Sequence, residues 1–185
     1  MTALIIRSSM TTSAPILIRA IREDDLDAVL RVQAACYPPA MQEPRAVVLA
    51  RLRAARGTTL VAVHGGAVCA YVFAYRSAAG AVTPLDAMFD IKDKGDTLYI
   101  HDLSVAPGAA GLGIARQLVD RLRALAAGAG LRQCALVSVQ DSQAFWERLG
   151  FAERPCAGDD ARLALASYPP VAVYMCSALA GVMQP

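Results

Sequence analysis

Lysine is almost absent from this chain of 185 residues: Lys92 and Lys94 are the only two, and arginine supplies the remaining positive charge. With 18 basic and 16 acidic residues, the formal net charge is only +2. Nucleic acids and anionic membranes attract strongly basic surfaces. We therefore expect neither of them as a partner.

Paired cysteines and long apolar runs are also lacking. The five cysteines are odd in number, widely spaced and without a C-x-x-C pair, which predicts neither a disulfide framework nor a bound metal. No window approaches the roughly 20 apolar residues of a membrane span. The N-terminus has no basic region before its short apolar patch, which excludes a secretory signal. We expect a cytoplasmic protein whose residues 1–14 form a disordered leader.

Apolar residues make up 56% of the chain, and its length suits one domain, which we place at residues 15–180. Apolar patterning predicts strands near residues 16–21, 58–63, 67–76, 98–105, 132–139 and 171–179. Helices are predicted near residues 26–36, 44–57, 113–130 and 142–151. This order predicts a mixed sheet with helices on its faces, an α/β (α+β) fold. Residues 78–96, rich in aspartate and broken by glycine and proline, read as a loop over a site.

The stretch "HDLSVAPGAAGLGIARQLVDRL", residues 101–122, places three glycines between a predicted strand and a predicted helix. Glycine adopts φ values that other residues avoid and lets a ligand touch bare backbone. A helix that begins near Gly113 presents free N–H groups and the positive end of its dipole, which favours a phosphate or pyrophosphate site. Taken alone, the glycines are equally well explained by the geometry of a tight turn.

Two motifs in this order resemble those of the GNAT superfamily of acyl-CoA-dependent N-acetyltransferases. The family signature, Val-x-Pro, two residues and then [Gln/Arg]-x-x-Gly-x-[Gly/Ala], is matched by Val105, Pro107, Gly113 and Ala115. Downstream, "AFWERLGF" resembles the family's F-x-x-x-x-G-F ending. The opening "IRAIREDDLDAVLRVQAACYP" also resembles the family's first strand and helix. The resemblance spans residues 16 to 178.

The resemblance implies a GNAT fold, with a central mixed sheet of six to seven strands and about four flanking helices. It also implies acetyl-CoA as co-substrate and transfer of the acetyl group from the thioester to a primary amine by direct attack. Backbone groups of Leu103 and Val105 would pair with the pantetheine arm like an added strand. The cofactor contacts implied are Leu103, Ser104, Val105, Ala110, Gly111, Leu112, Gly113, Ile114, Ala115 and Arg116.

Two positions depart from the family pattern. Ala110 stands where the family has Gln or Arg, so a side-chain contact to the pyrophosphate is missing and the backbone N–H groups must carry the binding. Arg116 lies near enough in sequence to compensate in part. Trp146 stands where a general-acid tyrosine is frequent, and an indole cannot give up its proton at working pH. We expect Trp146 to pack in the core.

An amine is nearly all protonated at neutral pH, so the reaction needs a proton acceptor. His101 is the side chain best matched to that task, and Asp102 is second. In a regular strand His101, Leu103 and Val105 share one face and Asp102 the other, unless a bulge intervenes. For both His101 and Asp102, a structural role without catalysis remains open.

Evidence on the acceptor is thin in the sequence. Tyr37 and Tyr99 are expected to line its side of the site, and the acidic loop at residues 86–96 would attract a cationic amine, although a solvated loop explains it equally well. The acceptor would be a small amine or a protein amino group. A homodimer is possible, since dimers are common for proteins of this kind.

Two alternatives remain. Ala110 and Trp146 allow a non-catalytic acyl-CoA-binding or regulatory module on the same fold, because a fold alone never proves activity. "GAAGLG" superficially suggests a dinucleotide-dependent oxidoreductase. Against that alternative, the G-x-G-x-x-G order is missing, and no acidic residue ends the next strand at the required distance.

Overall fold

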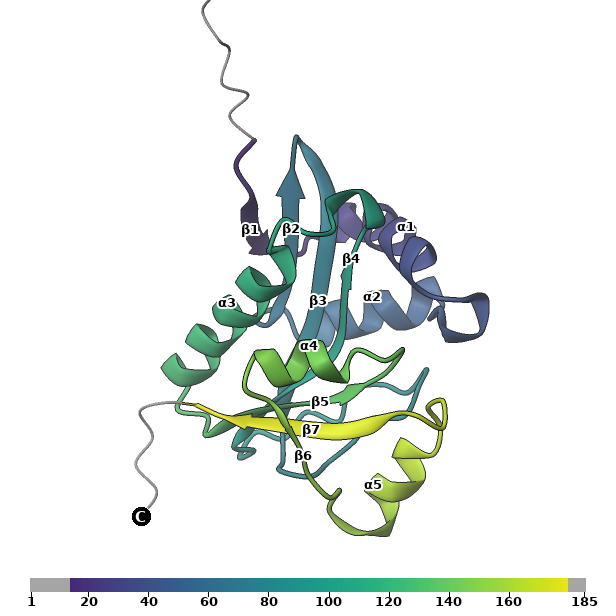
Figure 1. The fold of residues 1–185 in the computed structure, drawn as a ribbon, viewed down its shortest axis with the longest axis vertical. Coiled ribbons are helices and arrows are strands. Elements are labelled where there is room, and N and C mark those ends of the chain that lie inside the picture. Colours follow the sequence, from purple (N-terminus) through teal and green to yellow (C-terminus); the bar gives the residue numbers. More distant parts are fainter. Residues whose placement is uncertain (1–13, 180–185) are drawn as a thin grey trace, which may run out of the picture.

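Seven strands form one mixed sheet in the computed structural model, which describes residues 14–179 (Figure 1). The sheet order is β1-β2-β3-β4-β5-β7-β6. The strands are Leu17–Ala20 (β1), Thr59–His64 (β2), Ala67–Ser77 (β3), Thr97–Val105 (β4), Gln133–Ser138 (β5), Ala152–Glu153 (β6) and Val173–Ala178 (β7). Neighbours are antiparallel except β4 and β5, which run parallel. The leader expected at residues 1–14 lies outside the described residues, apart from its last residue.

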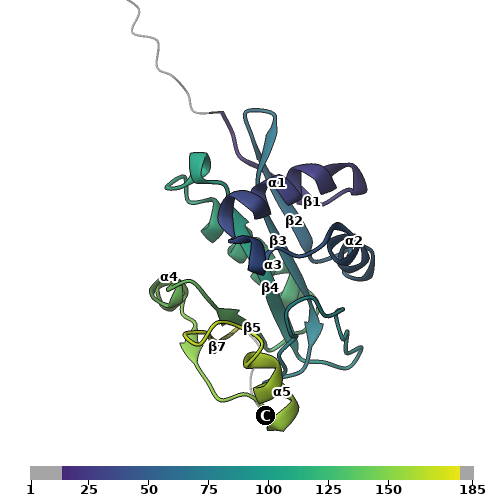
Figure 2. The ribbon, with the colours of Figure 1, turned by 90° about the vertical axis from the view of Figure 1, so that its right-hand side faces the viewer.

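Helices cover both faces of the sheet (Figure 2). The α-helices are Leu26–Cys36 (α1), Arg45–Ala54 (α2), Ile114–Gly128 (α3), Gln143–Arg148 (α4) and Gly158–Leu165 (α5). Short 3₁₀ turns occupy Glu23–Asp25 (η1), Pro39–Met41 (η2) and Pro107–Ala109 (η3). Between residues 14 and 179, no helix has the length and apolar character needed to cross a bilayer.

Strand alternation divides the core between the two faces. Val61, Tyr71 and Phe73 pack against α1 and α2, whereas Leu60 and Val72 join the cluster under α3. Successive side chains of a strand point to opposite faces, so β2 and β3 serve both layers at once. The face of α3 that packs on the sheet is apolar and includes the buried Ile114, Leu118, Val119 and Leu122.

The predicted strands and the four predicted helices are confirmed, with ends that shift by a few residues. Pro44 precedes α2 as its N-cap instead of opening its first turn. The short helix α5 and the two-residue strand β6 were not predicted. Both are short, and the exposed Leu163 of α5 leaves that helix without a clear apolar stripe.

Strands β4 and β5 separate after a short parallel pairing. They pair only between Thr97–Ile100 and Gln133–Leu136, although β4 continues to Val105. Figure 2 shows β5 and β7 turning away from β4 beyond this point. One side of β4 from residue 101 onward therefore has no strand partner, and this opening positions the site.

Candidate active site

The loop between η3 and α3 offers a run of free backbone N–H groups. No backbone or side-chain acceptor is recorded in the described structure for the amides of residues 111–116, and the helix's first bond beyond the loop runs from Gln117 N to Gly113 O at 3.2 Å. Gly111 and Gly113 have φ values of +81° and +71°, which favour glycine. Such amides at a helix N-terminus form an anion-binding site, so the expected pyrophosphate contacts fit.

Side chains around this loop leave the amides accessible. Gly111, Leu112, Gly113 and Arg116 are exposed, and Ile114 is buried and anchors the helix in the core. Ala110 supplies no polar group, as expected from the sequence. Main-chain N–H groups, together with the exposed guanidinium of Arg116, are thus what this loop offers an anion.

The open edge of β4 presents its backbone to the gap beside β5. Ala106 N donates to Cys69 O of β3 at 2.8 Å, so the backbone groups of Ser104 face β3 as well. Those of Leu103 and Val105 then face the open side, which suits an extended ligand added as a strand. Ser104 does not share this orientation. Its buried hydroxyl lies 3.4 Å from Asp102 Oδ1, and its backbone faces β3.

A β-bulge at His101 changes which side chains share a face. Phe73 pairs with Asp102 and Ala74 with Ile100, so His101 is the extra residue on β4. Leu103 packs in the cluster under α3, whereas His101 contacts Phe89 on the opposite face. The exception stated for a bulge therefore applies, and His101 does not share a face with Leu103 and Val105. His101 and Asp102 instead both line one pocket.

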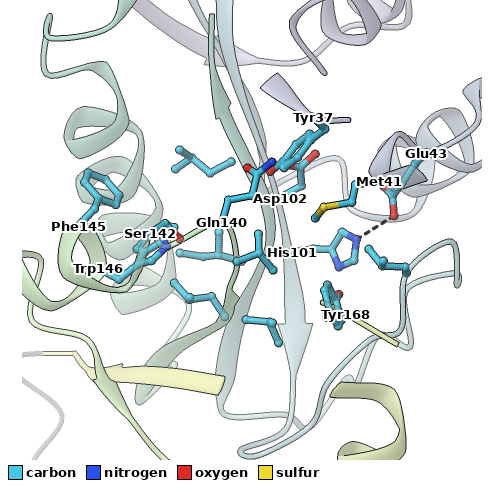
Figure 3. Close-up of a pocket in the computed structure, with 16 residues that line it drawn as sticks. Tyr37, Met41, Glu43, His101, Asp102, Gln140, Ser142, Phe145, Trp146 and Tyr168 are labelled. Carbon is cyan, nitrogen blue, oxygen red and sulfur yellow. Dashed lines mark hydrogen bonds and ion pairs between the residues drawn. The ribbon is translucent and has the colours of Figure 1, made fainter. Parts of the chain in front are cut away.

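This pocket, of about 170 Å³, lies where β4 and β5 part (Figure 3). Tyr37 follows α1, Glu43 follows η2, and Tyr168 follows α5, so segments far apart in the chain close it. Phe145 and Trp146 of α4 form the wall across from them. Among the described residues, the carboxylates that line it are those of Glu43 and Asp102, and no lysine or arginine of residues 14–179 lines it.

Asp102 is held by two tyrosines. Its Oδ1 accepts a hydrogen bond from Tyr37 Oη at 2.7 Å and its Oδ2 one from Tyr71 Oη at 2.5 Å. Burial raises the pKa of Asp102, and the two phenol hydrogen bonds oppose that rise. Burial raises the pKa values of both tyrosines well above their usual range, so they remain donors.

Glu43, Arg51 and His101 form a buried cluster at one end of the pocket. Arg51 donates to Glu43 through Nη1, and the same Nη1 lies 2.8 Å from His101 Nε2. Glu43 Oε1 lies 3.2 Å from that Nε2. Burial alone would raise the pKa of Glu43, but its contacts with His101 and Arg51 lower it to about 2. Glu43 is therefore a stable carboxylate.

Of the three other aromatic residues singled out in the sequence, two line the pocket and one does not. Tyr37 lines the pocket, as expected. Tyr99 does not line it: this side chain is 1% exposed, in a cluster with Tyr75 and Tyr174. Trp146 is 7% exposed and packs edge-on against Phe151. It is a core residue, as expected, and it also faces the pocket.

Three residues of the site were missed in the sequence. Glu43, Arg51 and Tyr168 come from segments where no motif marks them. Arg51 alone carried a signal, because it falls on the apolar face of α2, three residues after Val48.

The chain matches the model of the acetyltransferase (GNAT) family over residues 26–151. It belongs to the GNAT family. A comparison with curated proteins finds no match. The mostly antiparallel sheet of this GNAT chain also differs from the doubly wound parallel sheet of dinucleotide-binding oxidoreductases, which argues against that alternative.

Solved structures show the same fold. The GphF GNAT-like decarboxylase in complex with isobutyryl-CoA has a TM-score of 0.74 at 21% identity, over 88% of this GNAT chain and 99% of its own. The loading GNATL domain of CurA from Lyngbya majuscula has 0.73 at 9%, over 89% and 98%. The ribosomal-protein-S18-alanine N-acetyltransferase from Escherichia coli has 0.62 at 14%, over 92% and 97%.

The glycine loop generates a binding prediction. Gly113→Ala strains a residue at φ +71°, at a cost of about 1–2 kcal/mol, and displaces the amides that face the anion. We expect acetyl-CoA to bind at least about tenfold more weakly, as measured by calorimetry. Gly128→Ala is the matched control, since its new Cβ meets open space without a positive φ. Equal affinity in the two variants would contradict the pyrophosphate site.

The Glu43 carboxylate generates a pH prediction. Its folded-state pKa of about 2 lies below the ordinary 4.5, so its stabilisation is complete above pH 4.5 and is lost as the pH falls toward 2. Glu43→Gln should cost about 3 kcal/mol near neutrality, because Arg51 loses its counter-charge. In urea unfolding at a series of pH values, this deficit should shrink below pH 4.5. The exposed Glu147→Gln is the control, and a deficit independent of pH would refute the ion pair.

Proposed function

We propose that this GNAT protein is an acetyl-CoA-dependent N-acetyltransferase that acetylates a primary amine. The observation that carries the proposal is the carboxylate of Asp102, in the pocket beside the open edge of β4, since the charge of Glu43 is already paired with Arg51. An ammonium group is attracted to such a wall, whereas a carboxylate-bearing acceptor is repelled. The free amides of residues 111–116 support binding of the diphosphate of CoA.

Each part of the chain then has a task. The bound thioester supplies an activated acyl carbon with a thiolate leaving group. The backbone groups of Leu103 and Val105, which have no strand partner on the open side, align the pantetheine arm along β4. The pocket at the end of this edge holds the acyl group and the amine together, which lowers the entropic cost of their encounter.

Asp102 is the residue that we propose to take the proton from the ammonium group. A carboxylate accepts about four hydrogen bonds, so the two tyrosines leave lone pairs free. Burial raises its pKa and makes it a better base than an exposed aspartate. His101 Nε2 already contacts Arg51 and Glu43. These contacts favour Asp102 over His101 as the base, which reverses the order expected from the sequence.

The proton of the leaving group needs no tyrosine on α4. Thiolates with a reference pKa near 8.5 leave readily. Tyr174 does not line the pocket, and its hydroxyl accepts from Gly80 N at 2.9 Å. Tyr168 does line it, and its hydroxyl donates to Thr83 O at 2.7 Å. Transfer of the proton released on C–N bond formation to the thiolate yields free CoA and the amide.

Decarboxylation of a carboxyacyl-CoA is the second candidate. The decarboxylase GphF and the CurA loading domain match this fold with TM-scores of 0.74 and 0.73, against 0.62 for the Escherichia coli N-acetyltransferase. The Asp102 carboxylate opposes it, because it repels the carboxylate that such a substrate must place in the pocket.

Two assays on the purified protein separate these functions. Incubation of acetyl-CoA with an amine panel should release free thiol and yield an N-acetylated product by mass spectrometry. Incubation with malonyl-CoA alone should release no CO₂. Carbon dioxide without thiol release would establish the decarboxylase instead. Acetyl-CoA binding with neither reaction would indicate the non-catalytic module.

Replacement of the proposed base tests the mechanism. Asp102→Asn should lower kcat by about 10²-fold or more, because no carboxylate remains to accept the proton. Affinity for acetyl-CoA should change little. The wild-type rate should rise with pH through a midpoint above 3.8, and the variant should lose this limb. Asp90→Asn, in the exposed part of the 78–96 loop, is the control, and an unchanged kcat in Asp102→Asn would overturn the assignment.

A further inference from the structure

Arg51 is a buried cation with no task in the mechanism above. Its side chain is 1% exposed, on the face of α2 that packs into the core. A buried guanidinium needs partners for its charge and its donors. It donates to Ala87 O at 3.0 Å through Nε, to Glu43 through Nη1, and lies 5.0 Å above the ring of Phe89.

The fourth partner of Arg51 is the imidazole of His101. Nη1 of Arg51 lies 2.8 Å from His101 Nε2. A guanidinium keeps its protons and has donors only, so an N–H on Nε2 would point at another N–H. The shorter of the two contacts of Nε2 therefore favours a lone pair on this nitrogen, which accepts from Arg51. Glu43 Oε1, at 3.2 Å, competes for the same nitrogen as an acceptor, and its contact with Nε2 is the longer of the two.

This contact determines where the neutral ring carries its proton. With a lone pair on Nε2, the proton lies on Nδ1. Nδ1 is buried and has no hydrogen-bond partner in the described chain. The side chain is only 3% exposed, so solvent does not readily supply one. Figure 3 shows this second nitrogen turned away from Glu43, on the side of Tyr168. A buried N–H without an acceptor costs about 1–3 kcal/mol, which a ligand oxygen would offset.

We propose that Arg51 fixes His101 as the Nδ1–H tautomer, so that the imidazole donates a hydrogen bond to the carbonyl oxygen of the bound acyl thioester. Arg51 is then a positioning residue, and His101 a hydrogen-bond donor instead of a base. The carbonyl is the acceptor in the bound acyl group whose oxygen gains negative charge during attack. The hydrogen bond from His101 to the thioester carbonyl rests on the proposed acyl transfer. The Nδ1–H tautomer of His101 does not depend on that function.

Nitrogen-15 NMR of the wild-type protein tests the tautomer directly. The chain has two histidines, so the signals that remain in His64→Gln belong to His101. At neutral pH, long-range proton–nitrogen correlations should show a protonated Nδ1 and an unprotonated Nε2. A protonated Nε2 with a free Nδ1 would overturn the proposal, because His101 would then be a base oriented by Glu43.

Removal of Arg51 tests its positioning role. In Arg51→Met, Nε2–H becomes able to donate to Glu43, so the tautomer should shift toward Nε2–H, and Arg51→Lys should restore Nδ1–H at least in part. If Arg51→Met fails to fold, the double variant Arg51→Met/Glu43→Gln removes both buried charges and replaces it. An unchanged Nδ1–H tautomer in a folded variant without Arg51 would refute the positioning role.

Two substitutions of His101 test the donor. Asn places an amide N–H near the position of Nδ1 but cannot act as a base, and Leu provides neither function. We expect kcat to fall about 10²–10³-fold in His101→Leu and far less in His101→Asn, with KM for acetyl-CoA nearly unchanged in both. Equal losses in the two variants would contradict a donor role.

A ligand experiment keeps this inference separate from the proposed function. A ketone analogue of acetyl-CoA should shift the Nδ1–H proton of wild-type His101 downfield, and CoA without an acyl group should not. This readout needs no turnover. A shift without acetylation of any amine would retain the donor and refute the N-acetyltransferase, whereas binding of the analogue without a shift would refute the donor.

Discussion

The site depends on how β4 leaves the regular sheet. On one side the bulge at His101 breaks its register with β3, and on the other β5 departs after Ile100. The bulge turns His101 and Asp102 into one pocket, and the departure of β5 frees the backbone of Leu103 and Val105. A regular strand would have sent the two polar side chains to opposite faces and paired the edge. Two local irregularities therefore produce both a reactive pocket and a binding edge.

Buried charge organises the pocket as much as shape does. Arg51 joins α2, the segment after η2, the 78–96 loop and β4 through Glu43, Ala87 and His101. A buried ion pair by itself is weak evidence for stability, because desolvation opposes the attraction. What the cluster does provide is a fixed direction for the imidazole and a carboxylate that stays charged. Those are properties of a site that must present defined donors and acceptors.

The parts of the site that rest on short-range sequence were predictable. The positions of Gly111 and Gly113 follow from the turn between a strand and a helix, and the structure gives both positive φ. The parts that rest on long-range packing were not. No local pattern brings Tyr168, 67 residues after His101 in the numbering, into the same pocket. The burial of Tyr99 between Tyr75 and Tyr174 likewise depends on segments that are distant in the chain.

Two sites of opposite electrostatic character lie along one strand. The glycine loop after β4 offers only donors, from amides and Arg116, whereas the pocket within β4 offers carboxylates. A cofactor with a diphosphate suits the glycine loop, and a cationic reaction partner suits the pocket. The two do not compete, because each charged group is repelled from the other site. The absence of a side chain at Ala110 weakens the first site without altering this polarity. The distribution of charge along β4, more than any single residue, thus favours an anionic cofactor and a cationic acceptor.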